Sequence, residues 1–474
     1  MTVIHWFRRD LRLADNLALR AALATGQSVI PLFSFDPALL HGERFSAARL
    51  KFMLDGLHKL DESLREYGTR LLIRHGDPLH VFAHIIDETN ATALYFNRDY
   101  TPYAVKRDKR ITESLSIPVH AYDDAMLHDP DTVLTAEDKP YTVYTPFKRR
   151  WLDQPKPAVA SSAIPNQQFH NLDGLSNEPL PSVRDLTGHD SIAVPEAGEA
   201  AAKLRLDRFT ELGILDYAEA RNRLAINVFT SDDPATSGLS PYFRFGMLSP
   251  RQAYHAAMHA HADARSSSEN QSIAVWISEL AWREFYMGIL YHFPRVYNVS
   301  FRPEYENVAY RHAPDELERW QHGQTGYPIV DAAMRQMNQI GWMHNRARMI
   351  VASFLTKDLL IHWRAGDVYF MSQLIDGDPA ANNGGWQWSA GTGTDAQPYF
   401  RIFNPVSQSK QFDPDGAYIR HYVPELRDVP DKFIHAPWEM PAPPPAYPAP
   451  VVEHSFARER TLSAFKAIKQ KEPV

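Results

Sequence analysis

Hydrophobic positions in the first 130 residues alternate between short continuous runs and helical spacing. Apolar runs rich in β-forming residues occur at 3–7, 28–35, 70–74 and 93–96, and amphipathic segments separate them. Short strands that alternate with helices are typical of a parallel α/β sheet. The clearest helix follows Ser46, a good helix cap, and its apolar side chains recur every three or four residues: Leu50, Met53, Leu54, Leu57, Leu60 and Leu64.

The pattern changes near residue 200, where strand-like runs nearly disappear. Helical spacing predicts helices over 211–224, 273–292 and 345–363, whereas residues 155–199 are rich in Pro, Ser, Ala and Asn and have little periodicity. We therefore predict an α/β domain with a parallel Rossmann-like sheet at 1–130, a connector at 131–199 and an all-α domain at 200–474. A proline-rich stretch at 441–448 predicts an extended surface segment before a basic final helix.

Composition limits the classes of chemistry. The chain has 474 residues, 44% of them hydrophobic, and a formal net charge of -7, and no apolar run is long enough to cross a membrane. It contains no cysteine, which excludes disulfides, cysteine nucleophiles, iron–sulfur clusters and thiolate zinc sites. The N-terminus enters the first strand directly, without the features of a secretory signal, so we expect a cytoplasmic protein. The net charge hardly argues against nucleic acid, because a local basic patch can bind phosphates.

The segment 376–388 is unusual because it combines two carboxylates, amides and two indoles in thirteen residues. It superficially resembles a calcium loop, but Ala381 stands where the turn needs glycine and Gln387 stands where a bidentate glutamate belongs. We therefore predict no metal site. We interpret Arg348 and Asp376 as a partly buried ion pair, which leaves Asp378 and Asn382 to hydrogen-bond the edge of a heterocycle.

Two predicted helices add further polar and aromatic groups. On the first, Trp276, Glu279, Arg283 and Tyr286 share one face with Trp282 beside it, although a surface ion pair next to core aromatics would give the same pattern. On the second, Asn345, Arg348, Met349 and Ala352 share a face. Seven of the ten tryptophans lie between Trp276 and Trp388, so they either pack a core or provide stacking surfaces and a path for electrons. No G-x-G-x-x-G motif follows the first strand.

These segments, together with the motifs at 6–13, 145–147 and 401–405, resemble the DNA photolyases of the photolyase/cryptochrome superfamily. The resemblance runs nearly end to end and is specific to the bacterial-type enzymes that repair cyclobutane pyrimidine dimers. It implies an antenna domain followed by a helical domain that holds FAD in its reduced, anionic form, with Asn382 opposite the flavin N5. The FAD contacts that it implies are Tyr217, Thr236, Ser237, Gly238, Leu239, Ser240, Arg283, Arg348, Asp376, Gly377, Asp378 and Asn382.

The resemblance also implies the substrate and the reaction. The substrate is UV-damaged DNA whose dimer is taken out of the base stack, and an electron from photoexcited reduced FAD splits the cyclobutane ring and then returns. The implied catalytic residues are Glu279, Asn345, Met349, Asn382, Trp282 and Trp388. The implied DNA contacts are Arg221, Glu279, Trp282, Asn345, Arg346, Arg401 and Gln408.

Two positions depart from the family pattern. Relatives reduce the flavin through three tryptophans, and Trp386 and Trp363 match the first two, but Tyr310 stands at the third. A tyrosine is hard to oxidise unless its proton can leave, so we hypothesise that Tyr310 is the outer donor and keep Trp320 as the alternative. In the antenna segment, Ala104 stands where folate-binding relatives carry a glutamate.

The antenna pattern resembles that of deazaflavin-binding relatives at Phe35, Asp36, Asp99 and Arg244. We expect 8-hydroxy-5-deazaflavin in preference to FMN or methenyltetrahydrofolate, and a monomeric protein. Three alternatives stay open: a cryptochrome-type photoreceptor, a (6-4) photolyase, which would carry histidines at Asn345 and Met349, and a non-catalytic nucleic-acid-binding module.

Overall fold

The computed structural model describes residues 1–160, 164, 168–188, 190–224, 227–230, 235–396 and 398–469. Some positions of the predicted connector, 161–163, 165–167 and 189, therefore lie outside the described residues. The chain forms two compact units. Unit 1 contains Met1–Asp216 and Ser237–Pro294, and unit 2 contains Tyr217–Thr236 and Arg295–Val474. The predicted domain limits at residues 130 and 199 stay a prediction.

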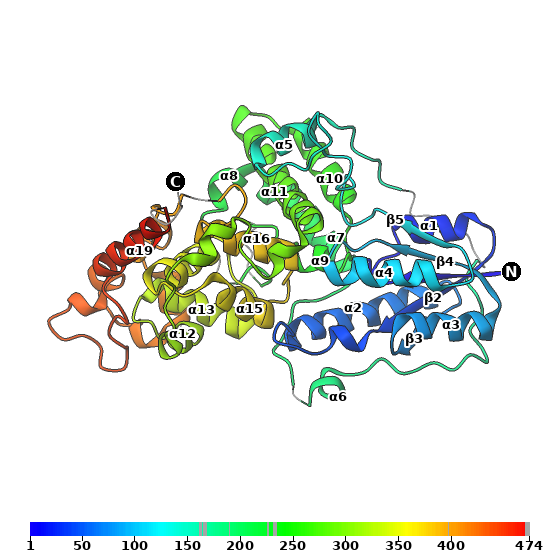
Figure 1. The fold of residues 1–474 in the computed structure, drawn as a ribbon, viewed down its shortest axis with the longest axis horizontal. Helices are drawn as coiled ribbons and strands as arrows, with labels where there is room; N and C mark the ends of the chain where they lie inside the picture. Colours follow the sequence, from blue (N-terminus) through cyan, green and yellow to red (C-terminus); the bar gives the residue numbers. More distant parts are fainter. Residues whose placement is uncertain are drawn as a thin grey trace. The chain divides into compact units, whose positions relative to one another are not determined.

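Unit 1 is built on a five-stranded parallel sheet (Figure 1). The strands are β1 (Thr2–Phe7), β2 (Ser28–Phe35), β3 (Leu72–His75), β4 (Ala91–Asn97) and β5 (Val119–Tyr122), in the order β3-β2-β1-β4-β5. Every residue of β1 is buried, and Trp6 pairs in register with Leu32 on one side and Phe96 on the other. Such continuous apolar strands are expected where both faces of a parallel sheet are covered. The predicted fold class of this part is confirmed.

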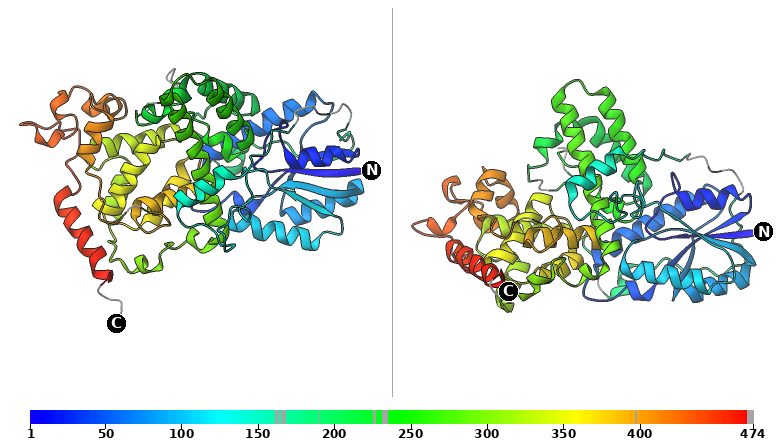
Figure 2. Two further views of the ribbon diagram at one scale, coloured as in Figure 1. Left: turned by 90° about the horizontal axis from the view of Figure 1, so that it is seen from above. Right: turned by 45° about the horizontal axis from the view of Figure 1, so that its top comes forward.

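Helices cover both faces of this sheet, as the right view of Figure 2 shows. Helices α3 and α4 pack on each other, as right-handed crossovers on one face require. Ser46 caps α2 by accepting a hydrogen bond from the backbone N–H of Arg49, as the sequence predicts. The helices that connect the strands are α1 (Leu17–Ala24), α2 (Ala47–Arg65), α3 (Pro78–Thr89) and α4 (Pro102–Ser114).

The rest of unit 1 is helical. Its longest helix is α11, which begins after the Ser266 cap and contains the predicted helix 273–292. Helix α10 packs on α11. The bounds are α5 (Tyr144–Asp153), α6 (Val183–Thr187), α7 (Glu199–Arg208), α9 (Ser240–Arg244), α10 (Pro250–Asp263) and α11 (Ser267–His292).

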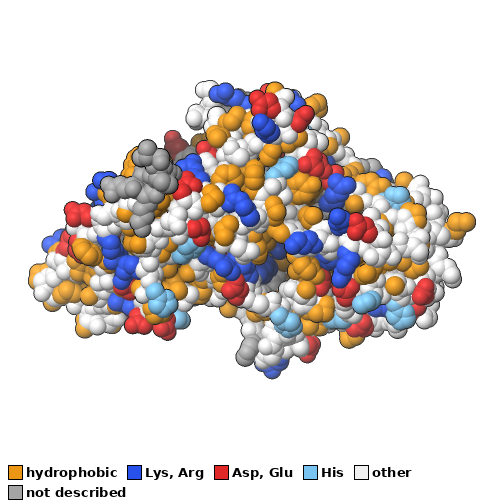
Figure 3. Space-filling view, viewed as in Figure 1, with side chains coloured by type: hydrophobic (Ala, Val, Ile, Leu, Met, Phe, Trp, Pro, Cys, Tyr) orange, Lys and Arg blue, Asp and Glu red, His pale blue; other side chains and the backbone are white. Residues whose placement is uncertain are grey.

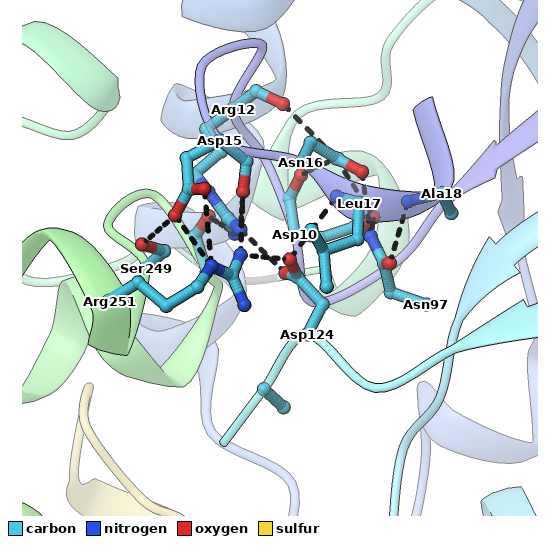
Figure 4. Close-up of polar contacts among 12 residues, drawn as sticks. Asp10, Arg12, Asp15, Asn16, Leu17, Ala18, Asn97, Asp124, Ser249 and Arg251 are labelled. Atoms are coloured by element: carbon cyan, nitrogen blue, oxygen red, sulfur yellow. Dashed lines mark hydrogen bonds and ion pairs between the residues drawn. The ribbon is translucent and has the colours of Figure 1, made fainter. Parts of the chain in front are cut away.

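A buried ion network joins the carboxyl ends of the strands to the start of α10 (Figure 4). Arg12 and Arg251 each donate to Asp124 at 2.6 Å, one guanidinium to each carboxylate oxygen. Arg251 also donates to Asp15 at 2.9 Å, and the Ser249 hydroxyl bonds the same carboxylate. Buried charges are tolerated only when they are paired in this way. The network therefore fixes the loops that follow β1 and β5.

Unit 2 is helical throughout its described part, as predicted. Its core contains the fully buried Trp320 and Trp363 together with Trp386. The proline-rich segment is anchored, because the Tyr447 hydroxyl donates to the buried Asp331 at 2.5 Å. The helices are α8 (Tyr217–Ala220), α12 (Pro314–Gln321), α13 (Pro328–Ile340), α14 (Asn345–Ser353), α15 (Trp363–Gln373), α16 (Pro379–Ala390), α17 (Pro405–Phe412), α18 (Ala417–Tyr422) and α19 (His454–Lys469).

Two predicted helices are wrong as continuous elements. Residues 211–224 contain a π-turn, a 3-10 turn and the short α8, because Gly213 interrupts the pattern at the point where the chain passes from unit 1 to unit 2. Residues 345–363 form α14 and a π-turn at Phe354–Asp358, and Leu360 then takes a left-handed conformation with φ 53°. No helix among the described residues is long and apolar enough to cross a membrane.

Candidate functional site

Helix α16 carries the amide and indole residues of the segment 376–388, and Asp378 caps its start. The Asp378 Oδ1 accepts hydrogen bonds from the backbone N–H groups of Ala380 and Ala381 at 3.0 and 3.2 Å, and Pro379 follows the cap. An aspartate cap and a proline at the first helical position fix the start of a helix. Asn382 and Trp386 are four residues apart and therefore share a face.

The amide of Asn382 is held in one orientation by Asp367 of α15. Its Nδ2 donates to the Asp367 carboxylate at 2.7 Å and to the Asp367 backbone oxygen at 3.1 Å. Asp367 is buried, so this contact is shielded from water. With Nδ2 committed to Asp367, Asn382 presents its carbonyl oxygen, which is a hydrogen-bond acceptor. The sequence does not reveal this partner, because Asp367 lies fifteen residues away on another helix.

The other two amides of α16 have a structural role. The Asn383 Nδ2 and the Gln387 Nε2 both donate to the Val296 backbone oxygen, at 2.9 and 3.0 Å. The Gln387 Oε1 accepts from the backbone N–H of Phe301 at 2.7 Å. Both side chains are buried and bind the loop 296–301 to the helix.

The predicted ion pair between Arg348 and Asp376 is present. The Arg348 Nη2 donates to the Asp376 carboxylate at 2.8 Å, and its Nε donates to the Met343 backbone oxygen at 2.8 Å. Asp376 is nearly fully buried, whereas a quarter of the Arg348 side chain is exposed. The pair ties α14 to the residues just before α16.

Trp386 of α16 belongs to one buried core cluster with Trp320 and Trp363. Trp386 contacts Phe370 edge-on, with ring centroids 4.9 Å apart, and Trp320 edge-on at 5.9 Å. Its six-membered ring also lies against Gly366 of α15, where an added Cβ would be only 2.0 Å from the indole. Trp363 is one helical turn before Gly366 and is fully buried. Electrons can pass between aromatic groups packed this closely.

Tyr310 lies in a small cluster with residues of α19. Its ring meets His362 edge-on, with centroids 4.8 Å apart, and it packs near Phe465. Its hydroxyl is buried and has no hydrogen-bond partner among the described residues. Burial raises the pKa of Tyr310 well above its usual value, and the charge of Glu306 adds to this effect.

Helix α14 collects several residues predicted to contact DNA. Arg346 donates to the Asn222 side chain at 2.7 Å, lies over the Phe412 ring at 4.4 Å and is close to the Met349 sulfur. Burial and the neighbouring charge of Arg221 lower the pKa of Arg346. Arg346 and Arg221 therefore concentrate positive charge at one place in unit 2. Burial lowers the pKa of His344 to about 3, so its neutral ring can cap α14.

In unit 1, Trp282 stacks on two aromatic neighbours. Its ring is parallel to that of Tyr144 at 3.5 Å, and Tyr286 stacks at 5.4 Å. The Tyr144 hydroxyl also donates to the Ser278 backbone oxygen at 2.8 Å, which fixes the tyrosine on α11. These contacts hold the half-buried Trp282 ring in one orientation.

The other predicted flavin contacts are distributed over both units. Arg283 donates to the Ala125 backbone oxygen at 2.6 Å and lies over the Phe243 ring at 5.6 Å. The residues in unit 1 are Ser237, Gly238, Leu239, Ser240 and Arg283, and those in unit 2 are Tyr217, Thr236, Arg348, Asp376, Gly377, Asp378 and Asn382.

Three of the predicted antenna residues, Phe35, Asp36 and Asp99, lie at or just after the carboxyl ends of β2 and β4, and Arg244 ends α9. Phe35 stacks on His75 with centroids 4.7 Å apart, and Asp36 accepts a hydrogen bond from the Tyr103 hydroxyl at 2.5 Å. Asp99 pairs with Arg9 at 3.2 Å, and the Arg9 Nε donates to the backbone oxygen of Arg244 at 3.0 Å. Tyr103 and Arg9 thus belong to this group, although the sequence pattern did not single them out.

The protein surface is mixed in charge. Figure 3 shows basic side chains interspersed with acidic and hydrophobic ones on the visible face. Of the remaining predicted DNA contacts, Asn345 and Arg401 are exposed and Gln408 is half-buried in α17. Phe400, beside Arg401, is 60% exposed, which is high for a phenylalanine. In the described residues, no group of three or more His, Asp or Glu side chains is placed to hold a metal ion.

Comparisons with known proteins identify the family. Residues 3–166 match the family model described as DNA photolyase, and residues 276–467 match the FAD binding domain of DNA photolyase. The deoxyribodipyrimidine photo-lyase of a Synechococcus species is 41% identical over 98% of this chain and 97% of its own length. The chain belongs to the DNA photolyase family.

Solved photolyase-family structures have the same fold. The class III photolyase of Agrobacterium tumefaciens has a TM-score of 0.89 and 36% identity, and covers 99% of this chain and 98% of its own. The cryptochrome of a Synechocystis species has a TM-score of 0.88 and 29% identity, and covers 98% of this chain and 99% of its own. The fold of the family therefore supports both an enzyme and a photoreceptor, and the site residues have to distinguish them.

Within this photolyase-family chain, the structure adds residues that sequence reasoning missed. Asp367 orients Asn382, Tyr144 stacks on Trp282, and Ser300 accepts a hydrogen bond from the Trp363 indole at 3.1 Å. Tyr144 directly precedes the motif at 145–147, so this motif is a sequence feature that could have pointed to Tyr144. Asp367 and Ser300 lie outside every motif.

Proposed function

We propose that this protein repairs cyclobutane pyrimidine dimers in DNA by light-driven electron transfer. The observation that carries the proposal is the pairing of Asn382 with the buried Asp367 on the helix that also holds Trp386. An amide fixed with its oxygen as acceptor suits a reduced flavin ring nitrogen that carries a hydrogen. A photolyase needs its flavin reduced, whereas a photoreceptor does not need to keep it so.

The donor set of the chain fits FAD. The Arg348–Asp376 pair and Arg283 supply charge and hydrogen bonds, while Tyr217 and the segment 236–240 supply aromatic, hydroxyl and backbone groups. We propose as FAD contacts Tyr217, Thr236, Ser237, Gly238, Leu239, Ser240, Arg283, Arg348, Asp376, Gly377, Asp378 and Asn382. When bound in its reduced, anionic form, FAD supplies the photoexcited electron donor. The protein holds and shields it.

The lesion is proposed to bind through aromatic faces and a polar edge. Trp282 and Trp388 provide the faces, and the stacking of Tyr144 keeps the Trp282 ring in place. The carboxyl group of Glu279, the amide of Asn345 and the thioether of Met349 are proposed to contact the dimer. Positive charge at Arg221, Arg346 and Arg401, together with Gln408, would anchor the phosphates on either side of the lesion.

The electron path and the antenna complete the proposal. Trp386 and Trp363 would carry electrons inward to a flavin that has become oxidised, with Tyr310 or Trp320 as candidates for the outer end. Phe35, Asp36, Asp99 and Arg244 would bind 8-hydroxy-5-deazaflavin, because the buried Ala104 cannot supply the carboxylate that folate-binding relatives use. We propose that the protein works as a monomer.

The proposal is tested with oligonucleotides that contain one thymine dimer, single- and double-stranded, in light and in darkness. We expect repair only in light and only with flavin bound. Trp388→Ala should weaken binding of the damaged strand by about 5- to 150-fold, which corresponds to the loss of about 1–3 kcal/mol of stacking. Trp438→Ala is the matched control, because it removes an indole that has no assigned role.

Two outcomes would contradict the proposal. A coloured, flavin-bound protein that binds damaged DNA but does not repair it in light would support a cryptochrome-type photoreceptor. A colourless protein that binds DNA would support a non-catalytic binding module. The antenna is tested separately by reconstitution, and the near-ultraviolet absorption band of bound folate in the purified protein would contradict the deazaflavin assignment.

A further inference from the structure

Three residues could end the electron path, and they differ in what surrounds their ionisable hydrogen. Oxidation of an indole or phenol makes that hydrogen strongly acidic, and a positive charge left in an apolar core is costly. A stable end point therefore needs a group that accepts the proton. The three residues are Trp363, Tyr310 and Trp320.

Trp363 has a hydrogen-bonded route to the surface. Its Nε1 donates to the Ser300 hydroxyl oxygen at 3.1 Å, and both groups are fully buried. The Ser300 side chain in turn bonds the Glu306 carboxylate, and the Ser300 backbone N–H donates to that carboxylate at 2.7 Å. The Glu306 side chain is 36% exposed, so its carboxylate meets solvent. The route is two hydrogen bonds long.

Glu306 is suited to accept a proton because it is charged before oxidation. Burial opposes its charge, but hydrogen bonds from Ser300 and the charge of His362 outweigh burial and lower the pKa of Glu306. The His362 Nε2 lies 3.6 Å from the Glu306 Oε2, whereas the Ser300 backbone N–H contacts Oε1. Burial lowers the pKa of His362. Glu306 is therefore the anionic end of the route.

The other two candidates have no such route. The Tyr310 hydroxyl is buried and has no hydrogen-bond partner in the part of the chain that the structure describes. The Trp320 Nε1 donates to the Val351 backbone oxygen at 3.1 Å, and an amide carbonyl is too weak a base to keep the proton. Neither residue has a hydrogen-bonded carboxylate among the described residues to take its proton after oxidation. This argues against Tyr310 as the outer donor hypothesised above.

We propose that the electron path of this protein ends at Trp363, with Ser300 and Glu306 as its proton exit. The inference rests on the proposed flavin function. With FAD bound, photoexcited and oxidised, Trp386 would supply one electron to it, and Trp363 would supply one electron to Trp386. The Nε1–H bond of Trp363 then breaks, its proton goes to Ser300, and the hydroxyl proton of Ser300 goes to Glu306. The result is a neutral Trp363 radical and a protonated Glu306. A thiol reductant later returns one electron and one proton to Trp363, and Glu306 releases its proton to solvent.

The test is transient absorption of the flavin-loaded protein after a light flash, which separates protonated from neutral tryptophan radicals. In the wild type the protonated radical should convert to the neutral one, and the conversion should slow in D₂O. Ser300→Ala and Glu306→Gln should slow it by at least about tenfold, since a positioned proton acceptor commonly contributes that much or more. Tyr310→Phe should leave radical yield and conversion unchanged. Glu304→Gln removes an exposed charge two residues away and is the matched control.

A second readout shows whether the variants are folded and whether the contact exists in the dark. The indole N–H resonance of Trp363 in the flavin-loaded protein should move toward its non-bonded position in Ser300→Ala. It should return in Ser300→Thr, which restores the hydroxyl and should also restore the conversion rate. Unchanged conversion in both Ser300→Ala and Glu306→Gln, or loss of the long-lived radical in Tyr310→Phe, would overturn the proposal.

The failure of the proposed function gives a different result. If flavin reduction does not use this path at all, no tryptophan radical forms after the flash, and Trp386→Phe behaves like the wild type. If the path is correct and the proton exit is wrong, radicals form normally and the Ser300 and Glu306 variants do not alter their decay.

Discussion

Two buried aspartates, Asp124 in unit 1 and Asp358 in unit 2, have opposite surroundings. Asp124 lies between two arginines, each 2.6 Å from one of its oxygens. Asp358 has one ionisable partner atom, the His454 Nδ1 at 2.5 Å from Oδ1, and its Oδ2 has no hydrogen-bond partner among the described residues. Both side chains are almost completely buried. One carboxylate is fully compensated and the other is not.

The pKa values diverge accordingly. Burial alone would raise the pKa of Asp124, but the charges of Arg12 and Arg251 outweigh it and lower the pKa. Burial raises the pKa of Asp358 to about 6, because His454 and Arg460 only partly oppose it. Its neighbour Lys357 is also buried, and burial lowers its pKa to about 7. Asp124 therefore keeps its charge in unit 1, whereas Asp358 and Lys357 in unit 2 are buried groups that can become neutral.

The largest expected effect comes from breaking the network in unit 1. Asp124→Asn leaves Arg12 and Arg251 without their shared counter-charge and should cost about 3–5 kcal/mol of unfolding free energy. Hydrogen exchange should accelerate most at the amides of β5 and the first turn of α10, which the network joins. The measurement is urea unfolding combined with amide exchange.

A surface pair provides the control for that variant. Lys203 and Asp207 on α7 are 2.5 Å apart, but their side chains are 67% and 46% exposed. Asp207→Asn should hardly change the unfolding midpoint, because solvent screens the pair. Equal losses in Asp124→Asn and Asp207→Asn would mean that burial of the network contributes nothing.

Much of the fold could be predicted from local pattern, and the failures have physical causes. Four strands and α2 follow from buried apolar runs and from the Ser46 cap. β5 was missed because its four residues are only partly buried, so its apolar run is weak. The break after α14 was missed because residues 350–355 and 359–361 form a nearly continuous apolar run. That break depends on contacts with α19, such as the one from Arg460 to the Asp358 backbone oxygen, which no local pattern contains.

The candidate site divides in the same way. The Arg348–Asp376 pair could be predicted because both residues belong to compact motifs with complementary charge. The partners Asp367 and Ser300 could not, since each is an ordinary polar residue whose role appears only when distant segments meet. Motifs thus predict which residue types form the site. Tertiary contacts determine how those residues are oriented.

The next effect tests the difference between the two aspartates through pH. The folded-state pKa of Asp358 is raised, so its contribution to stability is complete below the unfolded value near 4 and is lost as pH rises through about 6. The loss should be about 2–3 kcal/mol for a shift of about two pKa units. Asp124 has the opposite sign, and its contribution is lost as pH falls through its lowered pKa.

Asp358→Asn isolates this contribution. When the pH rises from about 4 to about 7, the unfolding free energy of the variant should fall less than that of the wild type. Amide exchange in α19 should also depend less on pH. Asp428→Asn, at an exposed position, should keep the slope of the wild type. A slope that is identical in all three proteins would remove the proposed contrast between the units.

A smaller effect tests whether close packing, not charge, maintains the indole cluster. In Gly366→Ala the new methyl group would overlap the Trp386 ring, where the available distance is 2.0 Å. Overpacking of this kind should cost about 1–3 kcal/mol, and the displaced indole should slow reduction of oxidised flavin in light. Gly288→Ala on α11 is the control, since nothing lies within 4 Å of its added Cβ. Unaltered flavin photoreduction in Gly366→Ala would show that the position of Trp386 is not critical.

The smallest expected effect concerns Asp367, the carboxylate that orients the Asn382 amide. Asp367→Asn replaces a carboxylate acceptor by an amide, which weakens the hydrogen bond from the Asn382 Nδ2. The Asn382 amide can then rotate so that its nitrogen and oxygen exchange places. We expect reduced flavin to be reoxidised by air about 2- to 10-fold faster, the factor that corresponds to about 0.5–1.5 kcal/mol. Asp367→Glu keeps the charge and should recover part of the loss if charge matters more than exact placement. If both variants reoxidise at the wild-type rate, the orientation of Asn382 does not depend on Asp367. The Asn382–Asp367 hydrogen bond would then no longer support the contrast between paired charges in unit 1 and single hydrogen bonds in unit 2.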